Sequence, residues 1–380
     1  MPGTKRKGKG DAWYLEVTIG TDFTGKPIRY NRTFHGSEKQ AEKALAIFYA
    51  DCCAGKVHKE SSMKISELCE TYKTEYVDRF LKKSTQSGVN AVIKIWINPL
   101  LGKKKISKLT RLDVQKFINH LIDKELSPKT IRNYYSVLRG MMDFAIGMDL
   151  IVDTPCQHIT LPKKKKVEAQ YYSEEDVTVL LKALDTLPDA ELQYKIAIYI
   201  ILFGGLRKGE VSGLNWEDIN FEKHKIEICR TRYINPGGGI YEDTPKTLES
   251  NRFVSLPKEI FDMFKLLKAQ QLEKKLQLQN KYIDSTAILQ GEFGGALRPQ
   301  VLQRWFTRFR EKNNLKYIGL HGLRHTHASM LAYMGADKMQ ISKRLGHSQL
   351  STTLNIYTHL FEQTDADIAD NLSEKYLVSK

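Results

Sequence analysis

The sequence predicts an α+β protein of several parts: a small β-sheet-plus-helix module, then a helical bundle, then a mainly α-helical part with a small antiparallel sheet. Two patterns carry this prediction. Near the N-terminus apolar and polar residues alternate, which is the period of a half-buried strand. Residues 62–162 instead repeat their apolar positions every three or four residues, which is the period of a helix. A chain of 380 residues has room for two or three domains with cores of their own.

Residues 1–58 are expected to form the first module. Two alternating stretches flank the turn T-D-F-T-G-K and predict a β-hairpin, with room for a third strand. Ser37 followed by Gln40 has the form of a capping box, so a helix should follow and cover one face of the sheet. The opposite face would carry Tyr14, Thr18, Arg29, Asn31 and Thr33, beside a basic tail from Lys5 to Lys9. The alternating apolar positions are Trp13, Leu15, Val17 and Ile19, then Ile28, Tyr30 and Phe34.

Residues 62–162 are expected to form a four-helix bundle. Pro128 directly after Ser127 marks the start of the fourth helix, and the stretch T-P-C-Q-H followed by P-K-K-K-K ends the unit. The lysines of that stretch then predict a basic linker. The four apolar stripes are Ile65, Leu68, Tyr72 and Tyr76; Val89, Val92, Ile93 and Trp96; Leu112, Phe117, Ile118 and Leu121; and Ile131, Tyr134, Leu138, Met141 and Phe144.

Residues 168–380 are expected to form the third part. Ser173 three residues before Asp176 marks a helix start, and the apolar segment 196–206 predicts a buried helix that ends at Gly204 and Gly205. Residues 225–230 and 252–256 predict two strands joined around P-G-G-G. Two further helices are expected, a polar one over Lys265–Tyr282 and a core one that contains Val301, Leu302, Trp305, Phe306 and Phe309.

Polar groups that can act on an anion are concentrated between residues 320 and 360. A helix that begins here puts His321 and Arg324 on one face of its first turns, where the positive end of the helix dipole favours a phosphate. An apolar stripe on the other face would anchor this helix on one side only, with a stop at Gly335. A second helix from about Lys338 to Gly346 leaves His347 at a turn, and Ser351 caps a third that carries Tyr357.

The charge balance indicates a polyanionic partner. The chain has 59 basic and 44 acidic residues, a net charge of +15. An anionic membrane is the competing partner, but the N-terminus lacks the apolar region of a signal peptide, and the longest apolar run, residues 196–203, is far below the ~20 residues of a spanning helix. Five cysteines without zinc spacing or an even count suit a reducing cytoplasm and buried free thiols.

Several short motifs occur in a fixed order along the third part. G-L-R-K-G-E at 205–210 is followed by the lysine of T-P-K-T, by H-G-L-R-H at 321–325, by L-G-H-S at 345–348 and by a tyrosine ten residues after that histidine. In this order they resemble the tyrosine recombinases, the integrase family of phages and conjugative transposons. The resemblance implies a site-specific DNA recombinase with six catalytic residues and Glu210 in support. The six are Arg207, Lys246, His321, Arg324, His347 and Tyr357.

The resemblance also implies the chemistry. Tyr357 attacks a DNA phosphate to give a 3′-phosphotyrosyl link and a free 5′-hydroxyl. The energy of the broken phosphodiester bond is conserved in the covalent intermediate, so no cofactor or metal is needed. Planar guanidinium forks of two arginines match the charged oxygens of the transition state. His321 is the expected proton acceptor for the tyrosine and Lys246 the donor to the 5′-oxygen, two roles that could be exchanged, while His347 donates a hydrogen bond to the phosphate.

By the same resemblance, residues 1–58 are an arm-type DNA-binding domain, 62–162 a core-binding domain and 168–380 the catalytic domain with a C-terminal tail. The expected partner is double-stranded DNA with core-type and arm-type att sites, bound as a homotetramer in which the tail docks on a neighbour. An excisionase and a host DNA-bending protein are candidate accessory partners, and no membrane is involved. Candidate DNA contacts are Lys5, Arg6, Lys7, Tyr14, Arg29, Lys103, Lys104, Lys129, Arg132, Arg139, Lys163, Lys164, Lys165 and Lys166.

Other interpretations of the same residues stay open at this point. Arg207 following the buried segment is also compatible with a buried structural salt bridge to Glu210. A lone loop lysine is usually only a soluble charge, and the sheet face is also compatible with plain solvation. His321 and His325 have zinc-protease spacing, but Gly322 stands where the motif needs glutamate and Arg324 would repel a cation. The alternative functions are a type IB topoisomerase-like DNA relaxing enzyme and a catalytically silent site-specific DNA-binding protein.

Overall fold

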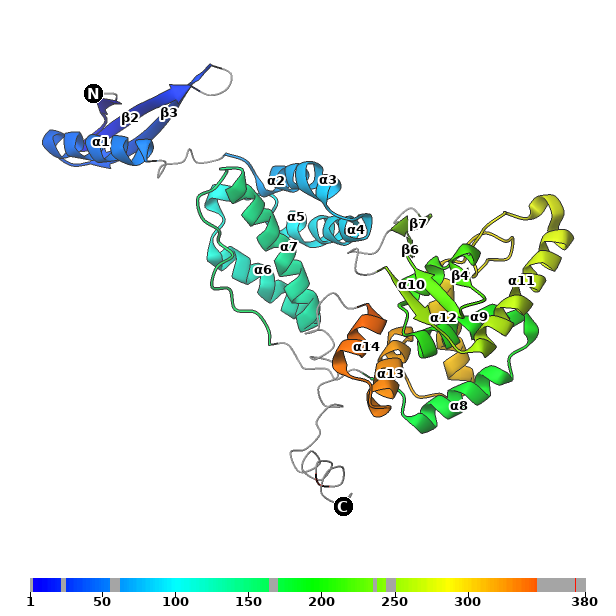
Figure 1. Cartoon of the computed structure of the whole chain (residues 1–380). Helices are drawn as coiled ribbons and strands as arrows, with labels where there is room; N and C mark the ends of the chain where they lie inside the picture. Colours follow the sequence, from blue (N-terminus) through cyan, green and yellow to red (C-terminus); the bar gives the residue numbers. More distant parts are fainter. Residues whose placement is uncertain are drawn as a thin grey trace. The chain divides into compact units, whose positions relative to one another are not determined.

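A computed structural model describes residues 3–21, 25–54, 62–163, 170–234, 238–243, 251–346 and Ser373 (Figure 1). The chain divides into two compact units, residues 1–165 and 166–380. The predictions on Lys246, His347, Tyr357, the lysines 164–166, the third short helix and the C-terminal tail lie outside the described residues. Among the described helices, none has the length and apolar character that crossing a bilayer requires.

The N-terminal module is a three-stranded antiparallel sheet with one helix against it (Figure 1). The hairpin and the capping box at Ser37 are confirmed, and the third strand comes from the basic segment that was expected to be a tail. The core joins the inward residues of the middle strand to the apolar stripe of the helix, with Leu15, Val17, Leu45 and Phe48 at its centre. The elements are β1 (Gly3–Lys7), β2 (Ala12–Thr21), β3 (Pro27–His35) and α1 (Glu38–Cys53).

The second part of the first unit is helical, as predicted. Its four helical segments span residues 65–80, 83–101, 111–123 and 128–147, and Thr110 and Ser127 cap the last two. Each of the first two segments contains a π-helical turn, which the sequence did not indicate. The elements are α2 (Ile65–Tyr72), η1 (Lys73–Val77), α3 (Asp78–Phe80), α4 (Lys83–Val92), η2 (Ile93–Ile97), α5 (Asn98–Leu101), η3 (Ile106–Lys108), α6 (Arg111–Asp123) and α7 (Pro128–Gly147).

Two predicted core positions of this bundle are wrong. Tyr76 is 37% exposed, and the neighbouring Val77 is buried instead. Leu112 is exposed, and Val114 takes the place in the stripe of α6 that ends in Phe117, Ile118 and Leu121. Two residues correspond to about 200° of rotation at 3.6 residues per turn, so Leu112 lies on nearly the opposite side of the helix from Val114.

The second unit is mainly α-helical with two small antiparallel sheets, one of order β4-β5-β8 and one formed by β6 and β7. Its elements are α8 (Glu174–Asp185), η4 (Asp189–Glu191), α9 (Leu192–Gly204), α10 (Lys208–Gly213), η5 (Trp216–Asp218), β4 (Ile219–Asn220), β5 (Lys225–Ile228), β6 (Thr231–Ile234), β7 (Ile240–Asp243), β8 (Arg252–Ser255), α11 (Lys258–Leu278), η7 (Gln279–Lys281), α12 (Pro299–Lys312), α13 (Leu320–Tyr333) and α14 (Lys338–Leu345).

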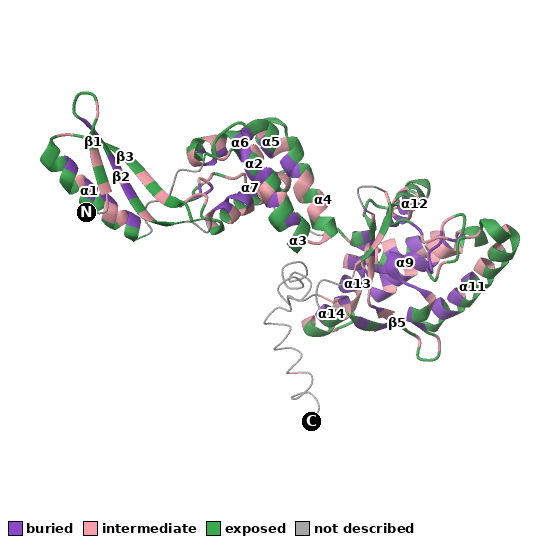
Figure 2. Ribbon diagram, turned by 90° about the horizontal axis from the view of Figure 1, so that it is seen from above, coloured by how far each residue is buried: buried purple, intermediate pink, exposed green. Residues whose placement is uncertain are grey.

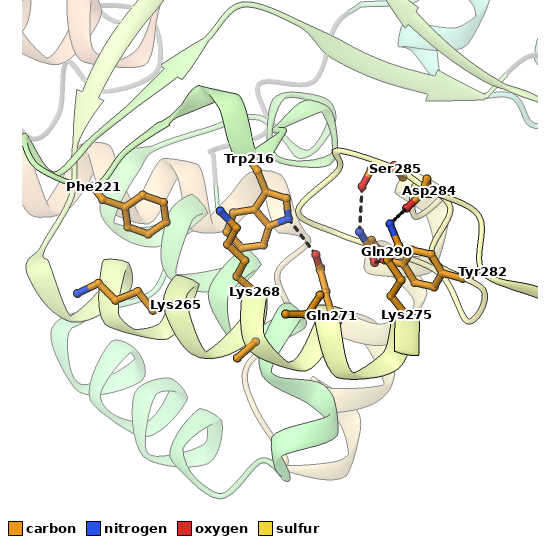
Figure 3. A pocket seen from close by; sticks show the side chains of 12 residues that line it. Trp216, Phe221, Lys265, Lys268, Gln271, Lys275, Tyr282, Asp284, Ser285 and Gln290 are labelled. Carbon is orange, nitrogen blue, oxygen red and sulfur yellow. Dashed lines mark hydrogen bonds and ion pairs between the residues drawn. The ribbon is translucent and has the colours of Figure 1, made fainter. Parts of the chain in front are cut away.

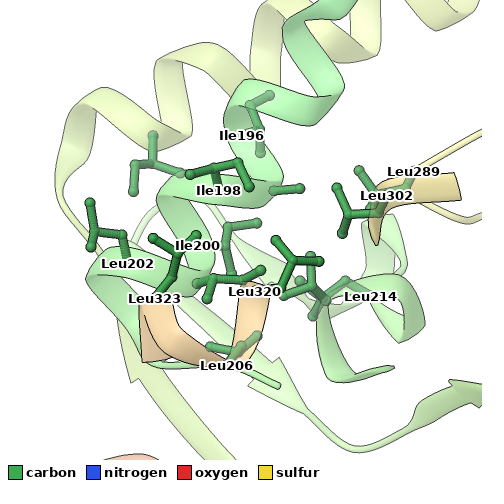
Figure 4. Close-up of a cluster of buried hydrophobic side chains, with 14 of the residues drawn as sticks. Ile196, Ile198, Ile200, Leu202, Leu206, Leu214, Leu289, Leu302, Leu320 and Leu323 are labelled. Atoms are coloured by element: carbon green, nitrogen blue, oxygen red, sulfur yellow. The ribbon is translucent and has the colours of Figure 1, made fainter. Parts of the chain in front are cut away.

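Helix α9 is the centre of this unit. It has almost no polar face, which is the pattern of a helix enclosed on all sides, and it contacts α10, α11 and α13. Figure 2 shows it as the most continuously buried helix of the unit. In Figure 4 its isoleucines meet Leu320 and Leu323 of α13 on one side and Leu214 and Leu302 on the other.

Three further predictions for this unit, and one for the cysteines of the whole chain, need correction. The P-G-G-G stretch joins β6 to β7, a hairpin inserted between the paired strands β5 and β8, rather than joining those two strands directly. Helix α11 begins at Lys258, earlier than the expected Lys265. Helix α13 is buried around most of its circumference rather than on one side, because its polar residues find internal partners. All five cysteines are free, but Cys53 is exposed and Cys229 is only half-buried.

Candidate active site

The buried carboxylate of Glu210 gathers three arginine side chains in the second unit. Its Oε1 accepts from Arg207 Nη1 at 2.8 Å and from Arg252 Nη1 at 3.3 Å. Its Oε2 accepts from Arg252 Nη2 at 2.9 Å and from the backbone N–H of Arg207 at 2.8 Å, and it lies 3.9 Å from Arg324 Nη1. The Glu210 side chain is 5% exposed and that of Arg324 is 1% exposed, so these two charges are removed from water and depend on their partners in the cluster.

The arginines keep Glu210 ionised. Burial on its own raises the pKa of this carboxyl, but Arg252, which also donates hydrogen bonds to it, and then Arg324 and Arg207 lower the pKa to about 2. At neutral pH the cluster therefore holds one negative and three positive charges, and the excess of positive charge favours an anionic ligand.

The same three guanidinium groups bind the C-terminal end of helix α14. The last carbonyls of a helix have no partner within the helix and carry the negative end of its dipole, so cations stabilise them. Here three consecutive carbonyls each accept from a different arginine, which fixes the chain just before position 347. The pairs are Arg252 Nε with the Arg344 carbonyl at 2.9 Å, Arg324 Nη2 with the Leu345 carbonyl at 2.8 Å, and Arg207 Nη2 with the Gly346 carbonyl at 3.3 Å.

Two glycines make room for this arrangement. Gly205 ends α9 with φ 68°, and a Cβ there would lie 2.5 Å from His327 Cδ2. Its carbonyl accepts from Arg324 Nη1 at 2.6 Å. Gly346 ends α14 with φ 67°, and a Cβ there would lie 2.7 Å from Arg252 Nη1. Both positions therefore need the left-handed backbone and the absent side chain of glycine.

The three histidines of α13 have different surroundings. His327 is buried, with its Nδ1 2.8 Å from the Leu202 carbonyl and its Nε2 3.1 Å from Arg344 Nε, so the neutral Nδ1–H tautomer satisfies both contacts. Burial and then Arg344 lower its pKa to about 3. The rings of His321 and His325 meet edge to face with centroids 4.6 Å apart. Desolvation and then the charges of Arg324 and Arg207 lower the pKa of His321 as well.

The described residues thus bring together part of the predicted site. Arg207 and Arg324 are joined through Glu210, and His321 lies one turn before Arg324 on α13. The Arg207–Glu210 salt bridge is present, but the expectation that Arg207 itself is buried is wrong. Its side chain is 40% exposed because it lies at the N-cap of the short helix α10, whereas Arg324 and Arg252 are buried.

The sequence reasoning missed Arg252 and Arg344 as members of this site. Arg252 lies on the same side of its strand as Val254, which is buried, so the two-residue period of the strand gave a signal that Arg252 points inward. Arg344 binds the carbonyls of Phe203 and Ser255 at 2.9 and 3.0 Å, contacts between distant segments that no local pattern indicates.

The candidate DNA contacts of the N-terminal module separate onto two faces of its sheet. The strand register pairs Arg6 with Tyr14, and both are exposed on the face opposite α1, together with Arg29. Lys5 lies on the other face, where its Nζ pairs with Glu38 and Glu42 of α1, and Lys7 alternates onto that face with it. The grouping of Lys5 with the exposed sheet face is therefore wrong, since successive residues of a strand point to opposite sides.

In the helical bundle the candidate contacts are on the surface, and several have protein partners. Lys104 pairs with Asp113, Arg132 Nε donates to the Pro162 carbonyl at 3.0 Å, and Arg139 lies 3.7 Å from Asp143. Lys103, Lys129 and Lys163 are exposed.

A surface pocket of the second unit lies between α11 and the η5 turn, and none of the Glu210 cluster lines it. Trp216 forms one wall, with its Nε1 donating to Gln271 at 2.9 Å and Lys268 Nζ 5.7 Å from its ring (Figure 3). Over the described ranges, no group of three or more His, Cys, Asp or Glu side chains is placed to hold a metal ion.

Comparison with known proteins identifies the class of protein that this fold and site define. The Phage integrase family matches residues 170–364, and an integrase N-terminal SAM-like domain matches residues 64–122. The chain belongs to the phage integrase family, whose members act as integrases and tyrosine recombinases. Nothing in these matches supports the topoisomerase or silent-protein alternatives.

Individual relatives cover nearly the whole chain. A tyrosine recombinase XerC-like protein of Caldanaerobacter subterraneus is 28% identical over 97% of both chains. The ICEBs1 integrase of Bacillus subtilis is 26% identical over 97% of this chain and 99% of its own. In fold, the chain is similar to the Tn1549 transposon integrase in complex with a circular intermediate DNA, with a TM-score of 0.70 and 22% identity over 83% of this chain and all of that one.

Replacing Glu210 by alanine should strongly destabilise the second unit, because three buried or half-buried cations lose their counter-charge. Removing one partner of a buried ion pair costs about 3–5 kcal/mol. Glu217→Ala is the matched control, since that carboxylate is exposed and its pair with Arg230 is worth at most about 1 kcal/mol. Urea unfolding measures both, and equal losses for the two variants would contradict the role given to Glu210.

The stability of the fold should fall as the pH drops from 6.5 toward 4.5. Burial lowers the pKa of His325 to about 4 and that of His327 to about 3, so below pH 6.5 the unfolded chain binds protons that the folded chain does not. Glu210 adds to this loss of stability only below pH 4.5, where its carboxyl is protonated in the unfolded chain but stays ionised in the folded chain, in which its pKa is about 2. Thermal midpoints measured across this window should decrease, and His325→Gln should flatten the curve; a flat wild-type curve would be inconsistent with neutral buried histidines.

Proposed function

We propose that this integrase cuts and rejoins DNA at the specific sites of a mobile element, for integration and excision, through a 3′-phosphotyrosyl intermediate on Tyr357. The observation that carries the proposal is the Glu210 cluster, which holds Arg207 and Arg324 in fixed relation and leaves an excess of positive charge. The order of the motifs supplies the other members of the site, Lys246, His347 and Tyr357.

Arg207 is the residue best placed to hold the scissile phosphate. Its side chain is half-exposed, one of its Nη groups is fixed on Glu210, and the other makes only a 3.3 Å contact with the Gly346 carbonyl, which a phosphate oxygen can replace. Arg324 is buried and donates to the carbonyls of Gly205 and Leu345. It therefore acts on the phosphate through its charge alone, unless a phosphate oxygen replaces one of these carbonyls as its acceptor. Both cations stabilise the charge that builds up on the non-bridging oxygens.

The proton transfers are assigned to His321 and Lys246. A tyrosine with a pKa of ~10 is neutral at pH 7 and must lose its proton to attack. His321 is a suitable acceptor because the lowered pKa keeps its ring neutral. As the bond between the tyrosine oxygen and phosphorus forms, the bond from phosphorus to the 5′-oxygen breaks, and Lys246 gives that oxygen a proton. His347 donates a hydrogen bond to the phosphate.

The partner is double-stranded DNA, bound by three parts of the chain. Two solved relatives in fold are a lambda integrase dimer on a core site and a lambda integrase tetramer on a Holliday junction, with TM-scores of 0.56 and 0.57. We assign residues 1–58 to arm-type sites, residues 62–162 to core-type sites and residues 168–380 to catalysis. The working assembly is a homotetramer on DNA in the bacterial cytoplasm, joined by the C-terminal tail, with an excisionase and a host DNA-bending protein as accessory partners.

Replacing Tyr357 by phenylalanine should abolish covalent attachment to DNA and leave DNA binding intact, because only the attacking oxygen is removed. The assay is incubation with a nicked suicide duplex of the element's own end, followed by a denaturing gel. Tyr333→Phe is the control, since Tyr333 is an exposed residue at the end of α13 and should still form the adduct. An adduct formed by the Tyr357 variant would rule this residue out as the nucleophile.

Arg207→Lys and Arg324→Lys should lower the cleavage rate by orders of magnitude while site affinity changes little. Lysine keeps the charge but loses the fork that matches phosphate oxygens, and many other phosphate contacts supply binding. Cleavage should also continue in EDTA. A loss of affinity equal to the loss of rate would argue against a transition-state role, and chelator-sensitive cleavage would revive metal chemistry.

A further inference from the structure

Two buried arginines lie close to one loop of the active site, Arg252 on the strand that follows the loop and Arg232 on β6, which pairs with the strand that precedes the loop. Arg232 is in β6 and Arg252 is the first residue of β8, with side chains 3% and 7% exposed. The segment 244–250 between β7 and β8 contains Lys246 and is outside the described residues, but the strands on either side of it are described. Both arginines bind the short helix α10, which begins directly after Arg207.

Arg232 joins the strand before the loop to α10. Its Nε donates to Glu242 of β7 at 2.6 Å, its Nη1 to the Ser212 carbonyl of α10 at 2.8 Å, and its Nη2 to Asn215 Oδ1 at 2.6 Å. Glu242 is the next-to-last residue of β7, so this contact lies close to where the loop begins. A planar guanidinium can satisfy acceptors in three directions at once, whereas an ammonium on a flexible stem does so less rigidly.

Arg252 joins the strand after the loop to the same helix. Its two Nη groups form a fork with the two oxygens of Glu210, at 3.3 and 2.9 Å, and its Nε binds the Arg344 carbonyl. The loop therefore begins and ends at strands that are bound to one six-residue helix.

Backbone packing prevents the hairpin from sliding along α10. A Cβ on Gly209 would lie 2.4 Å from Thr231 Cγ2, and one on Gly213 would lie 2.7 Å from the Arg230 carbonyl. These two glycines are four residues apart and so share one face of the helix, which lies directly against the start of β6. The start of β6 is consequently packed closely against α10, the helix that follows Arg207.

We propose that Arg232 and Arg252 are positioning residues, which hold the strands on both sides of segment 244–250 against α10 and thereby set the place of Lys246 relative to Arg207. This inference rests on the proposed function, in which Lys246 protonates the leaving 5′-oxygen. Loss of either arginine should then damage the proton step more than it damages DNA binding or phosphate recognition.

A change of leaving group separates that effect from general damage. Attack by Tyr357 breaks the bond between phosphorus and the 5′-oxygen, which must take up a proton. When sulfur replaces this bridging oxygen, the leaving group is a thiolate. Because a thiol has a pKa of ~8.5, the thiolate is stable enough to leave without receiving a proton from a general acid. A defect that comes from a displaced Lys246 is therefore rescued by the sulfur substrate, and a defect in folding, DNA binding or Arg207 is not.

The test compares Arg232→Lys with wild type on matched nicked duplexes that carry oxygen or sulfur at the scissile position. We expect the cleavage rate to fall on the order of 100-fold with oxygen, the lower end of what a general acid supplies, and to approach the wild-type rate with sulfur. For Arg252→Lys, sulfur should restore only part of the lost cleavage rate, because Arg252 also binds Glu210 and its replacement disturbs the arginine cluster as well. Glu242→Gln, at a half-exposed carboxylate, is a milder second variant with the same expected selectivity should Arg232→Lys fail to fold.

Arg230→Lys is the matched control, since that arginine is two residues from Arg232 but its guanidinium pairs with Glu217 and Asp218 instead. Any loss it causes should be equal on the two substrates. Lys246→Ala must itself be rescued by sulfur, and if it is not, the proton role assigned to Lys246 fails. If Lys246→Ala is rescued while Arg232→Lys and Glu242→Gln lose activity equally on both substrates, or lose none, the positioning role is overturned.

Discussion

The carboxylate of Glu210 is the constraint on which the rest of the second unit depends. A buried anion costs several kcal/mol unless it is paired, and here a forked arginine, a second arginine and a backbone N–H share its two oxygens. In return the carboxylate keeps like charges close together that would otherwise repel. Two of those charges, on Arg207 and Arg324, are the ones that the proposed mechanism places at the scissile phosphate, and the third, on Arg252, connects them to the sheet.

The surrounding elements follow from the need to bring these groups together. Helix α9 is apolar enough to fill the centre of the unit, and Gly205 caps its end, so that Arg207, two residues later, can cap the start of α10. Helix α13 brings Arg324 to the same place, and α14 ends with its carbonyls on the three guanidinium groups. Arg344 closes the arrangement by binding α9, β8 and the neutral ring of His327. The contacts that hold these helices and strands together are thus the same contacts that position the arginines of the site.

Local patterns predicted the elements well and the buried polar contacts poorly. The spacing of Arg207 and Glu210, the apolar run of α9 and the glycine stops of α9 and α14 are properties of neighbouring residues, so sequence alone was sufficient. The β6–β7 hairpin was missed because propensity does not say which strands pair, and helix α13 was expected to expose polar residues that in fact bind distant carbonyls. Arg252 and Arg344 depend on segments 42 and 141 residues away in the chain, which only the folded structure shows.

The most direct test of this account is the ionisation of Glu210 itself. Selective carbon-13 labelling of glutamate carboxyl groups, with Glu210→Gln to assign the resonance, allows its titration to be followed by NMR. Because the arginines lower the pKa of this carboxyl to about 2, its chemical shift should stay constant from pH 7 down to about pH 4. A resonance that titrates with a midpoint at or above the ordinary value of 4.5 would show that the three arginines do not share this carboxylate, and would contradict the account.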